Sequence, residues 1–190
     1  MKNSEKRDKI IVAANRLFET QGFNGTGVDQ IAAESGVTKR TLYKHFGSKD
    51  GLIREVLETH HESMMDSIRA DVFAYSKDPI KRLKRCFDLY RQWFGSSTFS
   101  GCIFIKTLNE LASCSPELSR LAQDAKAAMR DFIGEVAALG GACEPELLAE
   151  QLQLLLEGAI VVAQCGRGAA VVDTAQAIAD DLIARAFKDC

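Results

Sequence analysis

Residues 26–50, TGVDQIAAESGVTKRTLYKHFGSKD, constrain the fold more than any other stretch, because they encode two short helices joined by a tight turn. The first helix is predicted from apolar side chains at i, i+3 and i+4 spacing, namely Val28, Ile31 and Ala32. Gly36 suits the position just after that helix, where a left-handed backbone brings no Cβ clash. Thr38 can then cap the second helix with its hydroxyl.

The second helix of the pair, residues 39–46, has one apolar and one basic face. At 100° per residue, Leu42 and Phe46 fall on the buried side and Arg40 and Lys44 on the opposite side. Arginine and lysine are long donors that can reach guanine edges in the major groove. The pattern therefore predicts a DNA-reading helix.

These residues resemble the TetR/AcrR-type transcriptional regulators, whose N-terminal motif runs approximately T-x-x-x-x-I-A-x-x-x-G-V-S/T-x-x-T-L/F-Y-x-H/Y-F-x-S/N-K. The residues in register with that motif are Thr26, Ile31, Ala32, Gly36, Val37, Thr38, Thr41, Leu42, Tyr43, His45, Phe46, Ser48 and Lys49. The helix-turn-helix motif covers about 27–46, and the family-like region extends to about residue 65. The resemblance implies an all-α fold, with a three-helix DNA-binding domain over 1–50 and a larger helical effector-binding and dimerisation domain over 51–190.

The resemblance also implies which side chains touch DNA. Lys39 and Thr41 join Arg40 and Lys44 at base-facing positions, and the phosphate-gripping positions are occupied by Thr38, Tyr43, His45 and Lys49. Thr26 begins the first motif helix, where a hydroxyl and free N–H groups suit a phosphate. Gly27 stands where the family often has a second Ser or Thr, which weakens that contact.

Charge and composition indicate where the basic residues lie, in which compartment the protein occurs and in which state its cysteines are. Residues 1–50 hold nine Lys and Arg against six Asp and Glu, whereas residues 51–190 are net acidic. The N-terminus lacks the apolar core of a signal peptide, and the most apolar run, 158–166, is far shorter than a membrane span. We therefore expect a cytoplasmic protein without a membrane segment. The six cysteines form no C-x-x-C pair, so we expect reduced, individually buried thiols and no metal or other cofactor.

The rest of the chain is predicted to be helical. Helices are expected over about 4–21, 48–75, 78–94, 102–112, 115–140 and 144–165, followed by a last helix from Asp173. Gly22 ends the first of these, and Asp173 with Gln176 forms a D-x-x-Q capping box.

The helices over 147–162 and 175–187 have apolar faces too wide for packing on one side. In the proteins that this chain resembles, such helices form a four-helix bundle between two subunits, so a homodimer is implied. The alternative is a monomer with these helices at its centre.

Aromatic side chains gather between residues 87 and 104, and they have two interpretations. They are either a core cluster or the wall of an effector cavity between helices. The residues assigned to such a cavity are Phe87, Tyr90, Trp93, Phe94, Phe99, Cys102, Phe104, Met129 and Phe132, with Gln153 and Glu157 as polar anchors.

No catalytic motif is present, so we expect a regulator rather than an enzyme. The favoured hypothesis is a sequence-specific repressor that binds a palindromic operator in double-stranded DNA and leaves it when an apolar or aromatic small molecule binds. One alternative is a repressor that senses electrophiles or oxidants through Cys102, at the head of a short helix where a thiolate is favoured. Another is a helical adaptor that binds protein rather than DNA.

Overall fold

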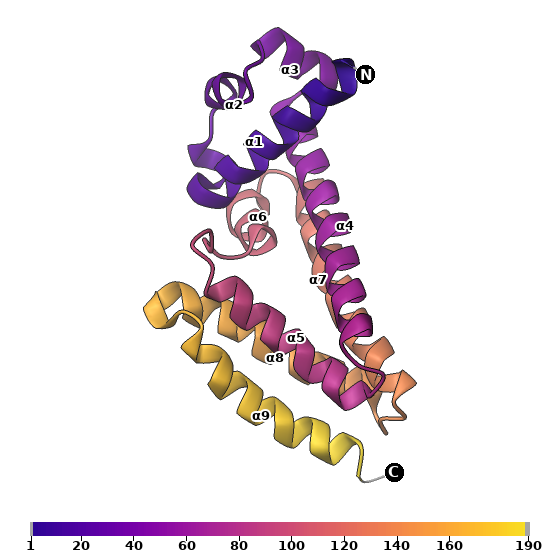
Figure 1. Cartoon of the computed structure of the whole chain (residues 1–190). Coiled ribbons are helices and arrows are strands. Elements are labelled where there is room, and N and C mark those ends of the chain that lie inside the picture. The colour runs from indigo at the N-terminus through magenta and orange to yellow at the C-terminus, as the bar shows by residue number, and fades with distance from the viewer. Residues whose placement is uncertain (1, 189–190) are drawn as a thin grey trace. The chain divides into compact units, whose positions relative to one another are not determined.

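The computed structural model describes residues 2–188, and within that range the chain is helical and contains no strand. The N-terminal helices are α1 (Lys2–Gly25), α2 (Val28–Ser35), α3 (Lys39–Phe46) and α4 (Lys49–Tyr75). They are followed by α5 (Pro79–Phe94), α6 (Ile103–Leu111), α7 (Pro116–Leu139), α8 (Pro145–Val162), the π-helical turn η1 (Ala163–Arg167) and α9 (Ala170–Ala186) (Figure 1). The predicted all-α fold class is confirmed.

Several helices begin where local sequence signals place them. At the start of α5, the Asp78 carboxylate accepts the N–H groups of Ile80 and Lys81, and Pro79 takes the first helical position. At the start of α4, the N–H of Gly51 donates to the hydroxyl of Ser48 at 3.0 Å. These caps satisfy N–H groups that have no partner within their own helix.

The start of α9 differs from the expectation. The helix begins at Ala170, so Asp173 and Gln176 lie inside it and do not cap it. Their side-chain oxygens accept instead from Nη2 of Arg91 on α5, at 3.0 and 2.6 Å. The capping-box prediction is wrong because a guanidinium from another helix binds both oxygens.

The described chain divides into two compact units. The first combines residues 1–63 with 102–125, and the second combines 64–101 with 126–190. Because α6 and the first part of α7 belong to the first unit, that unit contains more than the three predicted DNA-binding helices. The division into domains 1–50 and 51–190 stays a prediction.

Each unit has its own apolar core. In the first, the stripe predicted for α1 is buried, with Ile10, Ala14, Leu17 and Phe18 at most 1% exposed. In the second, α5, α8 and α9 pack together, as the lower part of Figure 1 shows. Their buried side chains include Leu83, Phe87, Leu152, Leu156, Ile160, Val172, Ala179 and Ile183.

The cysteines follow the expectation only in part. Cys86 and Cys102 are buried free thiols, and Cys102 is the residue that precedes the first turn of α6. Burial raises the pKa of Cys86 to about 12, so this thiol stays protonated. Cys114 and Cys165 are free but exposed, Cys143 takes part in a disulfide, and Cys190 lies outside the described residues.

Two kinds of feature are absent from residues 2–188. None of their helices has the length and apolar composition needed to cross a membrane. Their His, Cys, Asp and Glu side chains also form no group of three or more that could hold a metal ion.

Candidate nucleic-acid interface

The turn between α2 and α3 has the geometry that the sequence predicts. Gly36 adopts the left-handed conformation, with φ 69° and ψ 26°, and its N–H donates to carbonyls at the end of α2. The N–H of Val37 donates to the carbonyl of Ala32 at 3.1 Å. The hydroxyl of Thr38 then accepts the N–H of Thr41 at 3.2 Å and caps α3. These bonds fix the direction in which α3 leaves the turn.

Helix α3 presents a basic face to solvent. Leu42 and Phe46 are 0% and 9% exposed and hold the helix against the first unit's core. Arg40, Tyr43 and Lys44 are exposed on the other side. The predicted division into a buried face and a basic face is therefore confirmed, while the contacts of these side chains with DNA stay predictions.

The two other residues assigned to base-facing positions already have partners in the protein. The ammonium of Lys39 lies 2.5 Å from a carboxylate oxygen of Asp29 on α2. The hydroxyl of Thr41 lies 3.0 Å from that of Thr38. Each group has further hydrogen-bonding capacity, since an ammonium has three N–H donors and a hydroxyl has one donor and two lone pairs.

The residues assigned to phosphates differ in accessibility. Tyr43 is 46% exposed, so its hydroxyl can reach a ligand. His45 is half-buried, with its ring centroid 5.9 Å from that of Phe46. Lys49 is also half-buried, and its ammonium donates to the carbonyl of Phe23 at 2.6 Å. One of the three N–H bonds of Lys49 is thus used inside the unit.

Thr26 is hydrogen-bonded inside the first unit. Its side chain is 1% exposed, and its hydroxyl donates to the carbonyl of Gly22 at 2.7 Å. A second carbonyl, that of Leu17, lies 3.3 Å away. The hydroxyl thus satisfies backbone groups at the broken end of α1, and its contact with a phosphate stays a prediction.

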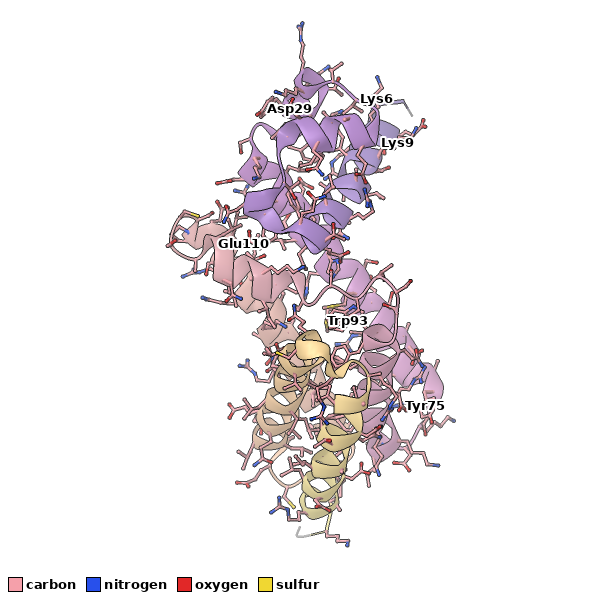
Figure 2. All side chains as sticks on the ribbon, turned by 90° about the vertical axis from the view of Figure 1, so that its left-hand side faces the viewer. Lys6, Lys9, Asp29, Tyr75, Trp93 and Glu110 are labelled. Atoms are coloured by element: carbon pink, nitrogen blue, oxygen red, sulfur yellow. The ribbon has the colours of Figure 1, made fainter. Side chains whose placement is uncertain are left out.

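The segment that leads into α2 is held by a residue that sequence reasoning missed. Gly22 interrupts α1 with φ 77° and ψ 172°, as predicted for a helix stop, and the turn continues to Gly25. The carboxylate of Glu110 on α6 accepts the N–H of Asn24 at 2.8 Å (Figure 2 labels Glu110). Lys106 of α6 donates to the carbonyl of Glu19 on α1. Because 86 residues separate Asn24 from Glu110, no local pattern pointed to this bond.

Two adjacent histidines of α4, His60 and His61, lie close to this region, and His60 approaches residues of α1. Nδ1 of His60 lies 3.2 Å from Oδ1 of Asn15 and 3.6 Å from Oε1 of Glu19. Burial lowers the pKa of His60, the negative charge of Glu19 opposes this effect, and the charge of His61 adds to it. Phe104 packs edge-on against both imidazoles, with centroid distances of 5.6 and 6.2 Å. This ring, which was assigned to the effector cavity, therefore belongs to the first unit.

Four of the predicted cavity rings form one cluster in the second unit. The ring of Trp93, labelled in Figure 2, contacts those of Tyr90, Phe94 and Phe99 at centroid distances of 5.8, 5.4 and 5.1 Å. Phe94 is buried, whereas Tyr90, Trp93 and Phe99 are only half-buried. The exposed parts of these rings leave aromatic surface that a ligand could contact.

The remaining members of the predicted set lie apart from this cluster or in the core. Phe87 and Met129 are 1% and 3% exposed. Phe132 packs against Phe73 at a centroid distance of 6.2 Å, and the guanidinium of Arg69 lies 4.9 Å from its centroid. The structure thus distributes the predicted aromatic wall over several places.

The two predicted polar anchors on α8 meet at one residue of α7. The ammonium of Lys126 lies 2.9 and 2.8 Å from the two carboxylate oxygens of Glu157, and both side chains are mostly buried. Nε2 of Gln153 donates to the carbonyl of Lys126 at 2.7 Å. Sequence reasoning missed Lys126, although its spacing of four from Ala122 and three from Met129 places it beside the buried stripe of α7.

A groove of about 390 Å³ lies elsewhere in the second unit, between the start of α8 and the end of α9. Its lining residues are Cys143, Glu144, Leu147, Leu148, Gln151, Leu182, Arg185 and Ala186. None of the residues that the sequence assigned to the effector cavity lines this groove.

The comparisons with known proteins agree with this geometry. Residues 10–56, which contain α2, α3 and their turn, match the family described as bacterial regulatory proteins, tetR family. The HTH-type transcriptional regulator LmrA of Bacillus subtilis is 40% identical over 85 residues, which are 44% of this chain and 45% of LmrA. The chain thus spans about half the length of that curated relative.

Two solved structures match nearly the whole chain. A TetR-transcriptional regulator from Streptomyces avermitilis is 30% identical, with a TM-score of 0.76, over 92% of this chain and 98% of the other. A TetR-family transcriptional regulator from Streptomyces coelicolor is 25% identical, with a TM-score of 0.87, over 97% of each chain.

Proposed function

The chain belongs to the TetR family of DNA-binding transcriptional regulators, and on that premise we propose that it is a homodimeric repressor released from a palindromic operator by an apolar or aromatic small molecule. As a member of this family it is a regulator and not an enzyme.

One observation carries the proposal for DNA reading. Arg40 and Lys44 extend from the exposed face of α3, and within residues 2–188 neither side chain is hydrogen-bonded or ion-paired to another protein group. Their donors are therefore available to guanine edges without loss of an existing bond. The buried Leu42 and Phe46 on the opposite face restrict how the helix can rotate in the groove.

The experiment compares two DNA duplexes by fluorescence anisotropy at physiological salt. One duplex carries the promoter immediately upstream of the gene for this protein, and the other is a scrambled duplex of equal length and composition. We expect wild type to prefer the promoter, and Arg40→Ala or Lys44→Ala to lose about 1–3 kcal/mol of specific binding. Unchanged promoter binding by Arg40→Ala would refute this docking of α3.

An exposed apolar stripe supports the homodimer. On α8, Leu147, Leu154 and Val161 recur every seven residues and are 46%, 74% and 51% exposed. On α9, Ile178 is 48% exposed. Apolar side chains at this spacing form a helical seam that a second copy of the pair can cover.

The proposed release mechanism is geometric. Two recognition helices related by a dyad bind successive major grooves only when about one helical turn of DNA, or a multiple of it, separates them. An effector that binds better to a state with another separation shifts the population toward that state. The size of the shift is set by the difference between its affinities for the two states.

The cluster of Tyr90, Trp93, Phe94 and Phe99 supports an aromatic effector. Half-buried rings offer flat apolar surface, and edge-to-face contacts with a further ring are favourable by about 0.5–1.5 kcal/mol beyond area burial. The mostly buried Lys126–Glu157 pair on α7 and α8 supplies polar groups in the same unit. Small-molecule sites typically join an apolar wall to a few polar groups.

A further inference from the structure

One acidic side chain lies at the edge of the DNA-reading surface and binds one of its cations. Asp29 occupies the first turn of α2, and Lys39 is the first residue of α3. The carboxylate oxygen Oδ1 lies 2.5 Å from Nζ of Lys39, and the two side chains are 80% and 52% exposed. Asp29 is labelled in Figure 2.

This pair distinguishes Lys39 from the other long cations of α3. Among the described residues, Arg40 and Lys44 have no acidic partner, whereas Lys39 has one that reaches across the turn from α2. The lysine ammonium is a point charge on a flexible stem, so an unpaired Lys39 could reach several phosphates. A carboxylate beside it restricts that range.

The pair contributes little to folding. An ion pair between exposed side chains gains little Coulomb energy in water and loses side-chain entropy. The interaction of the Asp29 charge with the N-terminal dipole of α2 adds a similarly small stabilisation. A negative charge next to a phosphate-facing surface, in contrast, weakens binding to every DNA sequence. The small stabilisation of the fold therefore does not account for a carboxylate at this position, where it weakens DNA binding.

We propose that Asp29 is a positioning residue, which holds the ammonium of Lys39 toward a base edge and away from the phosphates. The inference rests on the proposed function, in which α3 reads the operator. Asp29 lowers nonspecific affinity, because Lys39 must leave its carboxylate before it can neutralise a phosphate. It preserves base discrimination, because the restrained ammonium reaches few positions.

The test uses the full-length Asp29→Asn protein with two probes: a duplex selected by wild type from a random pool, and a scrambled duplex of the same composition. Loss of an exposed pair should raise affinity for the scrambled duplex by about two- to fivefold per subunit. The slope of log K against log salt should become more negative by about 0.9 per subunit, because the freed Lys39 neutralises one more phosphate. The ratio of selected to scrambled affinity should fall.

Two further variants separate positioning from a general charge effect. Glu117→Gln is the matched control, since Glu117 is also an exposed first-turn acid paired with a base, 2.7 Å from Arg54, but lies on α7. It should leave both slope and ratio unchanged. In a Lys39→Ala background, Asp29→Asn should no longer change the slope.

Three outcomes would overturn the inference. They are an unchanged slope and ratio in Asp29→Asn, the same changes in Glu117→Gln, or a slope change that persists without Lys39. If Asp29→Asn folds poorly by circular dichroism, Asp29→Ser gives the same comparison. Failure of wild type to prefer the selected duplex would instead refute the proposed function, so the two failures are distinguishable.

Discussion

Gly22 should tolerate a single added methyl group poorly, for two independent reasons. Its backbone has φ 77° and ψ 172°, a combination that is essentially confined to glycine. A Cβ built there would overlap Oε1 of Glu110. Gly22→Ala therefore has two separate costs, one in the backbone and one at Glu110.

The two costs can be given magnitudes. A non-glycine residue held in such a conformation costs about 1–3 kcal/mol. Displacement of Glu110 breaks its bond with the N–H of Asn24, which is exposed, so water replaces much of it and the loss is about 0.5–1.5 kcal/mol. We expect Gly22→Ala to lower the free energy of unfolding by about 2–4 kcal/mol, a large fraction of the 5–15 kcal/mol of a typical domain.

Urea unfolding followed by circular dichroism measures this change, at equal protein concentrations because association alters apparent stability. Gly25→Ala is the matched control: Gly25 lies three residues on, has no positive φ, and a Cβ there would meet only Cβ of Gln21 at 3.9 Å. In a Glu110→Ala background, Gly22→Ala should cost less, because the collision and the bond are already gone. A Gly22→Ala protein as stable as Gly25→Ala would refute the reasoning.

Three further predictions concern assembly, effector binding and pH. Leu154→Glu should convert a dimer to a monomer in sedimentation velocity, because it places a charge in the exposed apolar stripe of α8. Leu139→Glu is the control, at a 66% exposed leucine of α7, and should leave the dimer intact. If the Leu154→Glu protein is still a dimer, α8 is not part of the interface. An aromatic ligand should change the fluorescence of Trp93, which is the only tryptophan in the sequence. Phe99→Ala should abolish this change, because Phe99 packs against Trp93, whereas Phe73→Ala should retain it, because Phe73 packs against Phe132. If no ligand of a broad aromatic panel changes the fluorescence, the aromatic site is contradicted. Folding lowers the pKa of His60 from its ordinary 6.5, so the unfolded state binds more protons than the folded state as the pH falls through that value. The free energy of unfolding should therefore decrease as the pH drops below about 6.5. His60→Gln should reduce this loss between pH 7.5 and 5.5 in urea unfolding, and an equal loss would exclude His60 as the cause.

The elements that sequence reasoning placed correctly are those with short-range causes. Gly36 ends α2 because of its own left-handed backbone, and Asp78 with Pro79 begins α5 through bonds to the next residues. The division of α3 into buried and exposed faces follows from helical periodicity alone. In each case the groups that determine the local structure lie within a few residues of one another in the sequence.

The features that could not be predicted depend on partners distant in sequence. Asp173 and Gln176 have a capping pattern, but the guanidinium of Arg91, about 80 residues earlier, binds their oxygens. The spread of the predicted effector rings has the same origin. Phe104 meets His60 and His61 in one unit, while Trp93 meets Phe99 in the other. Aromatic composition gave the residues but not which rings pack together.

The inward orientation of Thr26 follows from the break at Gly22. Once the helical conformation stops there, the last carbonyls of α1 lose the N–H donors that a continuing helix would supply. The carbonyl of Gly22 accepts the hydroxyl of Thr26, and the carbonyl of Phe23 accepts the ammonium of Lys49 at 2.6 Å and the N–H of Thr26 at 3.4 Å. A buried carbonyl without a donor costs about 1–3 kcal/mol, so these bonds stabilise the unit in the absence of DNA. Motif position therefore identifies Thr26 and Lys49 as part of the DNA-reading unit, but the helix end determines where their donors point.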